Sequence, residues 1–229
     1  MVAENRDIEM KILSYLLLLG FFSIHDIFAC PNEILDKIYV ISLDKTLHKS
    51  EFVKNQLNKF GFKRVNFRDA DKNYFSNHRA VWQDIIKNKY KKAIIFEDNV
   101  EFRDNFKENL AKVIKNIPDD FDIFFLDIGK NKPHAEKTFF VSAGFWLNGL
   151  LNTPSPYYAK LKRTKQIWGS HAYCISSKSA EKLLELTENT DIPVDVAIID
   201  HANSLNLYVS KIKLVSGNHF DSEIAKLGQ

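Results

Sequence analysis

The chain has 229 residues, enough for one domain with a sizeable core. Hydrophobic residues make up 45% and charged residues 27%, as in ordinary globular proteins. The formal net charge is only +3, and Lys and Arg are spread along the sequence without a basic stripe, so the sequence argues against a nucleic-acid partner.

The N-terminal region contains an apolar stretch. Residues 12–24 (ILSYLLLLGFFSI) follow Lys11 and lead to Ala29, a small residue where a signal peptidase can cut. The stretch is shorter than the roughly 20 residues that span a bilayer comfortably. We therefore expect residues 1–29 to be an export signal or an uncleaved membrane anchor, the latter with the domain on the cytoplasmic membrane face, and residues 30–229 to form the folded domain. A buried amphipathic helix is the alternative.

The two cysteines, Cys30 and Cys174, do not indicate a metal site or a disulfide framework. Cys174 lies in an apolar run and is expected to be a small core residue. A disulfide between the two is the less favoured alternative.

In the first half of the chain, short β-rich runs alternate with segments of helical spacing. Strands are predicted at 37–42, 65–68 and 93–96, and helices at 48–60, 75–90 and 103–117. The run Ala93–Phe96 is apolar without interruption, which predicts a central parallel strand covered on both faces.

The second half continues the alternation. Strands are predicted at 122–128, 171–176 and 207–212, and helices at 178–186, with Ser177 as N-cap, and at 191–202. Residues 130–166 are irregular. The pattern predicts an α/β fold: one Rossmann-like domain with a mainly parallel central sheet and right-handed crossovers. The chain contains no Gly-rich phosphate loop of the dinucleotide or P-loop type.

Two acidic residues, Glu97 and Asp98, directly follow the strand at 93–96. Open α/β sheets bind ligands at the carboxyl ends of their strands, so this pair is a candidate metal site. Carboxylate oxygens suit hard cations such as Mg²⁺ or Mn²⁺. Adjacent strand residues point to opposite faces, so only one of the two reaches a metal unless the chain turns there. Solvated residues at a strand exit are the alternative interpretation.

Several separated motifs share an order and spacing that covers roughly residues 37–200. They are Ser42-Leu43-Asp44-Lys45, Phe67–Asp71, His78 with Trp82, Ala93–Val100, Gly169–Tyr173 and Pro193-Val194-Asp195. Together they resemble glycosyltransferase family 25, which includes bacterial lipopolysaccharide galactosyltransferases and collagen galactosyltransferases.

This resemblance implies a GT-A type fold, a UDP-linked sugar donor and a divalent metal, Mn²⁺ or Mg²⁺. It implies transfer of a hexose, with galactose favoured, to a hydroxyl of a glycan, a lipooligosaccharide or a protein, with inversion at the anomeric carbon. As the nucleoside diphosphate leaves, negative charge grows on its phosphate oxygens, and a metal bridging them to acidic side chains stabilises that charge.

The resemblance also assigns roles to individual residues. The expected metal ligands are Glu97, Asp98, Asn99 and His171, and Asp195 is the expected general base. Donor-binding residues are expected at Ser42, Leu43, Asp44, Lys45, Asp71 and His78, and acceptor or loop contacts at Trp146, Tyr157 and Arg163. Core packing is the alternative for the histidines and aromatics. For Asp195 the alternative is complementing a helix N-terminus, and for Arg163 it is a solvated loop.

Asn99 departs from the family pattern, which has a third acid at this position. An amide oxygen can bind a hard cation but brings no charge, so weaker metal binding, metal-independent donor binding or lost activity are expected, in that order. The alternative function is therefore a glycan- or nucleotide-binding pseudoenzyme of the same fold. A third hypothesis is an exported surface protein that serves adhesion. If the protein is instead the enzyme, it can associate with a membrane through residues 12–24.

Overall fold

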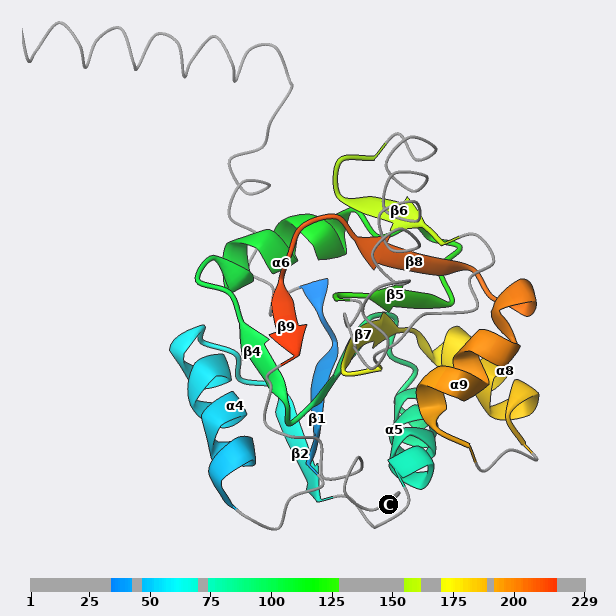
Figure 1. Ribbon diagram of the computed structural model, residues 1–229, viewed down its shortest axis with the longest axis horizontal. Helices are drawn as coiled ribbons and strands as arrows, with labels where there is room; N and C mark the ends of the chain where they lie inside the picture. The colour runs from blue at the N-terminus through cyan, green and yellow to red at the C-terminus, as the bar shows by residue number, and fades with distance from the viewer. Residues whose placement is uncertain are drawn as a thin grey trace, which may run out of the picture.

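A seven-stranded sheet, in the order β2-β1-β3-β7-β5-β8-β6, forms the centre of the computed structural model (Figure 1). The structure describes residues 34–42, 47–69, 74–127, 155–161, 170–188 and 192–217. The predicted leader, residues 1–29, lies outside them. Among the residues that the structure describes, none of the helices combines the length and the hydropathy of a membrane span.

Five of the seven strands run in one direction, which makes the sheet mostly parallel. They are β1 (Lys37–Ser42), β2 (Val65–Asp69), β3 (Ala93–Glu97), β5 (Ile123–Phe125) and β8 (Leu207–Ser210). The remaining two, β6 (Tyr158–Lys160) and β7 (Ala172–Ile175), are antiparallel to their neighbours. We call the edge where the five strands end the carboxyl edge; β6 and β7 begin there. The other end of the strands is the opposite edge.

Helices cover both faces of the sheet. On one face lie α4 (Leu47–Lys59) and α6 (Phe106–Lys115), and on the other lie α5 (Tyr74–Lys87), α8 (Ser177–Leu186) and α9 (Val194–Asp200) (Figure 1). The alternation along the strands divides the core accordingly: in β1, Val40 packs toward α4 and α6, whereas Tyr39 and Ile41 pack toward α5. The apolar runs read from the sequence are therefore strands buried on both faces, as predicted.

A short ribbon extends the structure beyond the main sheet. Strand β4 (Val100–Phe102) pairs antiparallel with β9 (Val215–Gly217), and Phe102 packs its ring against Phe106 at 4.6 Å between centroids. Asp98 and Asn99 form the tight turn that joins β3 to β4. The chain thus turns directly after Glu97, which the sequence pattern left open.

Most predicted elements are confirmed, with shifts of one to three residues at their ends, and the mixed α/β domain with a mostly parallel sheet is confirmed as well. Three expectations need correction. Strand β3 has a parallel neighbour only in β1, because β7 enters the sheet at the carboxyl edge and pairs antiparallel with it. The cap of α8 is Ser176, whose hydroxyl accepts from the Ser179 N–H. The last predicted helix ends at Asp200, and a 3₁₀ turn, Ala202–Ser204, follows.

Candidate active site

The last residue of β3 and the first residue of the turn after it are two consecutive buried carboxylates at the carboxyl edge. The Glu97 N–H donates to the His171 carbonyl at 2.9 Å, and the Asp98 N–H donates to the Ile41 carbonyl at 3.1 Å. The pair is thereby fixed between β1 and β7. Glu97 is 7% exposed and Asp98 5% exposed, so the interpretation of solvated residues at a strand exit is wrong.

The Glu97 side chain points toward α5 and β7. The Ser170 hydroxyl donates to its Oε1 at 2.9 Å, and His78 Nε2 lies 3.8 Å from the same oxygen. Glu97 occupies the same face of β3 as Ala93 and Ile95, which pack under α5. A fully buried histidine from the helix therefore faces the carboxylate from the strand.

A chain of hydrogen bonds fixes the orientation of His78. Trp82 Nε1 donates to the Tyr173 hydroxyl at 2.9 Å, and His78 Nδ1 lies 2.8 Å from that hydroxyl. An indole N–H can only donate, so the tyrosine oxygen accepts from Trp82 and its own proton is available to His78 Nδ1. This arrangement favours the tautomer with the proton on Nε2, which faces Glu97.

These neighbours keep Glu97 ionised. Burial is the largest single influence and raises its pKa, but His78, His171 and the Ser170 hydroxyl together outweigh burial, and the pKa lies below the ordinary value of 4.5. Burial also raises the pKa of the Tyr173 hydroxyl well above its usual range, so that side chain stays protonated. Glu97 is therefore a buried, ionised carboxylate at the carboxyl edge.

Asp98 faces the other side of the turn. The Ser42 hydroxyl, 3% exposed at the end of β1, donates to Asp98 Oδ2 at 2.7 Å. Ser42 was predicted to bind the donor; the contact seen here is to Asp98, whose carboxylate it orients, and its role toward a donor stays a prediction.

Asn99 is half-buried, and its Oδ1 atom is buried without a hydrogen-bond partner among the described residues. A buried carbonyl oxygen without a donor is unfavourable by about 1–3 kcal/mol, so an unfilled acceptor at this turn fits an oxygen ligand for a hard cation. In the described ranges no group of three or more His, Cys, Asp or Glu residues is close enough to hold a metal by itself. Any metal here would depend on oxygens from a ligand or water.

His171, at the start of β7, contributes its backbone to the site. Its carbonyl accepts from Glu97, whereas its side chain lies with Nε2 3.4 Å from Asp127 Oδ2, at the end of β5. The side chain therefore has a carboxylate partner of its own. Asp127 was not singled out from the sequence, although it follows an apolar strand in the same way as Glu97 does.

Two further predicted residues belong to other elements. Asp195 is half-buried in the first turn of α9, where its Oδ1 accepts from the Val196 N–H at 2.9 Å. Tyr157 precedes β6, four strands from β3, which places it about 19 Å away at ordinary strand spacing. The structure thus does not bring Tyr157 together with the acidic pair.

The remaining predicted site residues lie outside the described residues. They are Leu43, Asp44, Lys45, Asp71, Trp146 and Arg163. Conversely, Ser170 and Tyr173 make the central contacts of the site but received no role from the sequence. Both belong to the Gly169–Tyr173 motif, so the motif pointed to the right segment without showing which side chains face Glu97.

Comparisons with known proteins show which family the chain is similar to. Residues 69–198 match the model of glycosyltransferase family 25 (LPS biosynthesis protein). Human procollagen galactosyltransferase 2 is 25% identical over 113 residues, which are 48% of this chain and 16% of that protein. The chain therefore spans only a small part of that relative's length.

Solved structures with a similar course of the chain include a glycosyltransferase involved in the glycosylation of the major capsid of PBCV-1. It has a TM-score of 0.47 and 7% identity, over 83% of this chain and 96% of that one. Mannose-1-phosphate geranyltransferase from Thermus thermophilus has a TM-score of 0.49 and 9% identity, over 80% of this chain and 74% of that one. Since the family model covers more than half of the chain and includes Glu97, Asp98, Ser170 and Tyr173, the chain belongs to glycosyltransferase family 25.

Proposed function

We propose that this glycosyltransferase transfers a hexose, with galactose favoured, from a UDP-sugar to an acceptor hydroxyl, with metal assistance and inversion. The observation that carries the proposal is the buried Glu97–Asp98 pair at the carboxyl end of β3, inside the region that the family model matches. Ligands of open α/β sheets bind at this edge. The proposal includes a GT-A type fold and a glycan, lipooligosaccharide or protein as acceptor.

Asp98 and Asn99 would hold the metal, Mn²⁺ or Mg²⁺. Such ions are often bound by one or two carboxylates, with substrate phosphates and water completing the shell. When bound, the metal would stabilise the negative charge of the leaving diphosphate. Because Asn99 brings no charge, we expect little metal binding before the donor is present.

Glu97 would act from the α5 side of the turn. Its ionised carboxylate is held by Ser170 and faced by His78, so it is oriented before any ligand arrives. We propose that it accepts a hydrogen bond from a ribose hydroxyl or a bound water. His78 would fix the carboxylate rather than contact the donor, because its ring is fully buried.

Removal of the acceptor proton needs a general base, and Asp195 is the proposed one. Asp195 lies in the first turn of α9, where one of its carboxylate oxygens accepts from the Val196 N–H. A general base requires the remaining oxygen to reach the acceptor hydroxyl. Asp195→Asn keeps the shape and removes the basicity, so it should abolish transfer to an acceptor while UDP still binds.

The direct test measures UDP release from UDP-galactose and UDP-glucose, with and without Mn²⁺. We expect faster release from UDP-galactose, dependent on Mn²⁺ and reduced by Asp98→Asn. Equal, metal-independent release by wild type and Asp98→Asn would contradict the metal role.

The amide at position 99 favours a second candidate, a nucleotide-binding pseudoenzyme. In that case UDP would raise the Tm without any turnover on either donor, and Asn99→Asp would restore release. Failure of UDP to raise the Tm at all would contradict both candidates.

A further inference from the structure

The opposite edge of the sheet carries a concentration of positive charge that the proposed reaction does not use. Two loops lead into β2 and β3 there; with the last residue of the helix before each, they span residues 59–64 and 87–92. Six exposed side chains of these loops form what we call the basic rim: Lys59, Lys63, Arg64, Lys87, Lys89 and Lys91. Including Lys92, the two loops hold seven cations and no acid. Their charge of +7 compares with +3 for the whole chain, so the remainder carries −4.

The fold brings the two loops to either side of the start of β1. The Asp36 N–H donates to the Lys92 carbonyl and the Ile38 N–H to the Arg64 carbonyl, each at 3.0 Å. Since β1 lies between β2 and β3, the loops are two strand spacings apart, about 10 Å. Cations distant in the sequence are thus gathered along one edge.

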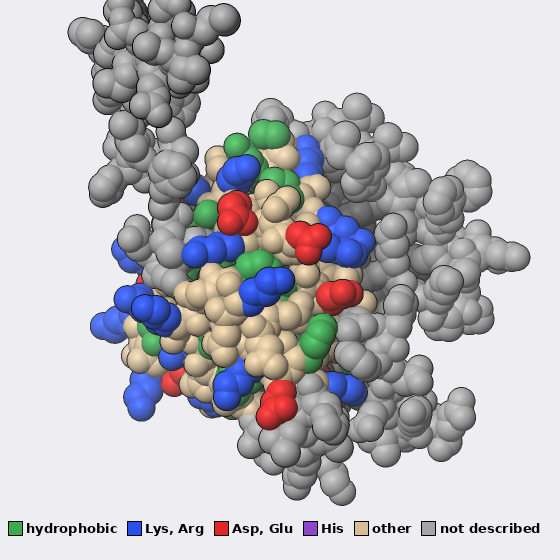
Figure 2. Space-filling view, turned by 90° about the vertical axis from the view of Figure 1, so that its left-hand side faces the viewer, with side chains coloured by type: hydrophobic (Ala, Val, Ile, Leu, Met, Phe, Trp, Pro, Cys, Tyr) green, Lys and Arg blue, Asp and Glu red, His purple; other side chains and the backbone are tan. Residues whose placement is uncertain are grey.

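Nearby groups do not neutralise the rim. The Asp36 carboxylate accepts from the backbone N–H groups of Lys91 and Lys92, at 2.6 and 2.9 Å. Lys92 itself donates to the Ile114 carbonyl at the end of α6, so we leave it out of the rim. Within the part of the chain that the structure describes, no carboxylate forms an ion pair with any of the six side chains. Lys and Arg also outnumber acidic side chains on the side formed by α4 and β4 (Figure 2).

The apolar stretch of the sequence joins the domain at this same edge. The first described residue, Ile34, lies just before β1, ten positions after Ile24, the end of the stretch. Ten residues reach at most about 35 Å when extended. The end of the apolar stretch, Ile24, is therefore tethered within about 35 Å of the start of β1.

We propose that the basic rim docks on an anionic lipid surface, next to residues 12–24. Exposed Lys and Arg side chains are attracted to anionic headgroups, and stable membrane attachment generally needs two signals, here an apolar segment and a basic patch. The six residues of β1 separate the rim from Ser42 and Asp98 by about 20 Å. Docking through the rim leaves the carboxyl edge open to a soluble donor.

The test is flotation of the full chain with vesicles of phosphatidylcholine alone or mixed with phosphatidylglycerol, at low and raised salt. The rim variant Lys63→Gln/Lys91→Gln is compared with a control of equal charge change, Lys54→Gln/Lys213→Gln, whose two side chains are exposed and lie outside the rim. Each positive charge removed from the rim should weaken binding to anionic vesicles about fivefold. The rim variant, which lacks two such charges, should therefore bind them about 25-fold more weakly than the control. Raised salt should weaken wild-type binding.

Equal binding of the two variants, or equal binding of wild type to both kinds of vesicle, would overturn the proposal. So would duplex DNA that displaces the vesicles by competing for the rim, since the partner would then be a nucleic acid. The Tm of the rim variant should equal that of wild type, because both substituted side chains are exposed. Unchanged Tm with weakened flotation supports docking independently of whether the chain turns over a sugar donor.

Discussion

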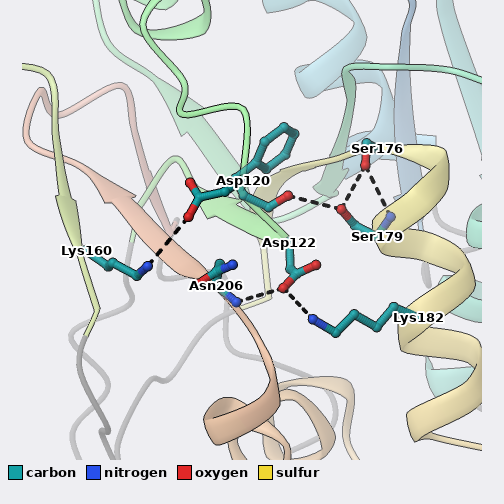
Figure 3. A network of polar contacts seen from close by, with 8 residues as sticks. Asp120, Asp122, Lys160, Ser176, Ser179, Lys182 and Asn206 are labelled. Carbon is teal, nitrogen blue, oxygen red and sulfur yellow. Dashed lines mark hydrogen bonds and ion pairs between the residues drawn. The ribbon is translucent and has the colours of Figure 1, made fainter.

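Two carboxylates at opposite edges of one sheet are equally buried but have different partners. Asp122, just before β5, is 7% exposed, like Glu97. Its Oδ2 accepts from the Lys182 ammonium at 2.8 Å and from the Asn206 N–H at 2.7 Å (Figure 3). Glu97 has a hydroxyl donor and a histidine at 3.8 Å, and no Lys or Arg partner among the described residues.

The surroundings of Asp122 tie secondary-structure elements together. Ser179 of α8 donates to the Phe121 carbonyl at 3.2 Å, and Lys160 of β6 pairs with Asp120 at 3.6 Å (Figure 3). The side chains of Asp120, Asp122 and Ser179 each contact another protein group in this network. At the carboxyl edge, by contrast, two consecutive acids precede an amide whose oxygen has no partner among the described residues. Burial of a carboxylate therefore does not identify a site; unused hydrogen-bonding capacity beside it does.

The largest expected difference between the two edges is in turnover. Asp98→Asn keeps an acceptor for the Ser42 hydroxyl but removes the charge that would hold the metal, so release of UDP should fall about 100-fold or more. The Tm should change little. Full activity of Asp98→Asn would place the site elsewhere.

The opposite edge should respond in stability instead. Asp122→Ala leaves the Asn206 N–H without its acceptor and the Lys182 ammonium without its partner, which should lower the free energy of unfolding by about 2–3 kcal/mol. The folded fraction should keep its kcat. Lys182→Met is the matched control. Because the Lys182 side chain is 38% exposed, this substitution should lower the free energy of unfolding by less than about 1 kcal/mol. Urea denaturation measures both, and a larger loss in the control would contradict the interpretation.

The hydrogen-bond chain behind Glu97 should show an intermediate effect. Tyr173→Phe leaves the Trp82 indole N–H and His78 Nδ1 without the buried hydroxyl between them. This loss should lower the free energy of unfolding by about 1–2 kcal/mol. Tyr208→Phe removes a hydroxyl that donates to the exposed Asp120 and should have a smaller effect. If the chain also positions Glu97, Tyr173→Phe should raise KM for the donor, a change that Tyr208→Phe would not share.

The smallest effect concerns pH. The folded pKa of Glu97 is lowered, so its ionised form stabilises the fold above the ordinary value of 4.5, and this contribution is lost as pH falls through the folded pKa. The difference in unfolding free energy between wild type and Glu97→Gln should therefore be largest near neutral pH and narrow below pH 4.5. Urea denaturation across this range measures it, with the exposed Glu101→Gln as control. A difference that grows in acid would mean that the carboxyl is protonated in the fold.

The sequence predicted the parts of this comparison that depend on local pattern. The run Ala93–Phe96 predicted β3, and its position before two acids predicted the carboxyl edge as the site. Local pattern could not predict the antiparallel direction of β7, because direction depends on where the chain re-enters the sheet. For the same reason Ser170 and Asp127 were not predicted as partners: each meets its partner across strands.

Tertiary pairing also decided which acids have a cationic partner. Asp122 and Asp98 both flank apolar strands in the sequence, and only the structure shows Lys182 at one and Ser42 at the other. The basic rim is a similar case, since its six cations do not stand out along the sequence and gather only when β1 enters between β2 and β3.

The most direct measurement is the change in Tm on adding UDP with Mn²⁺ to wild type, Asp98→Asn and Lys182→Met. We expect UDP to raise the Tm of wild type and of Lys182→Met by the same amount and to leave the Tm of Asp98→Asn unchanged, because Asp98, unlike Lys182, would help to hold the metal and, through it, the diphosphate. An equal shift in all three proteins, or none in wild type, would contradict a nucleotide site at the carboxyl edge.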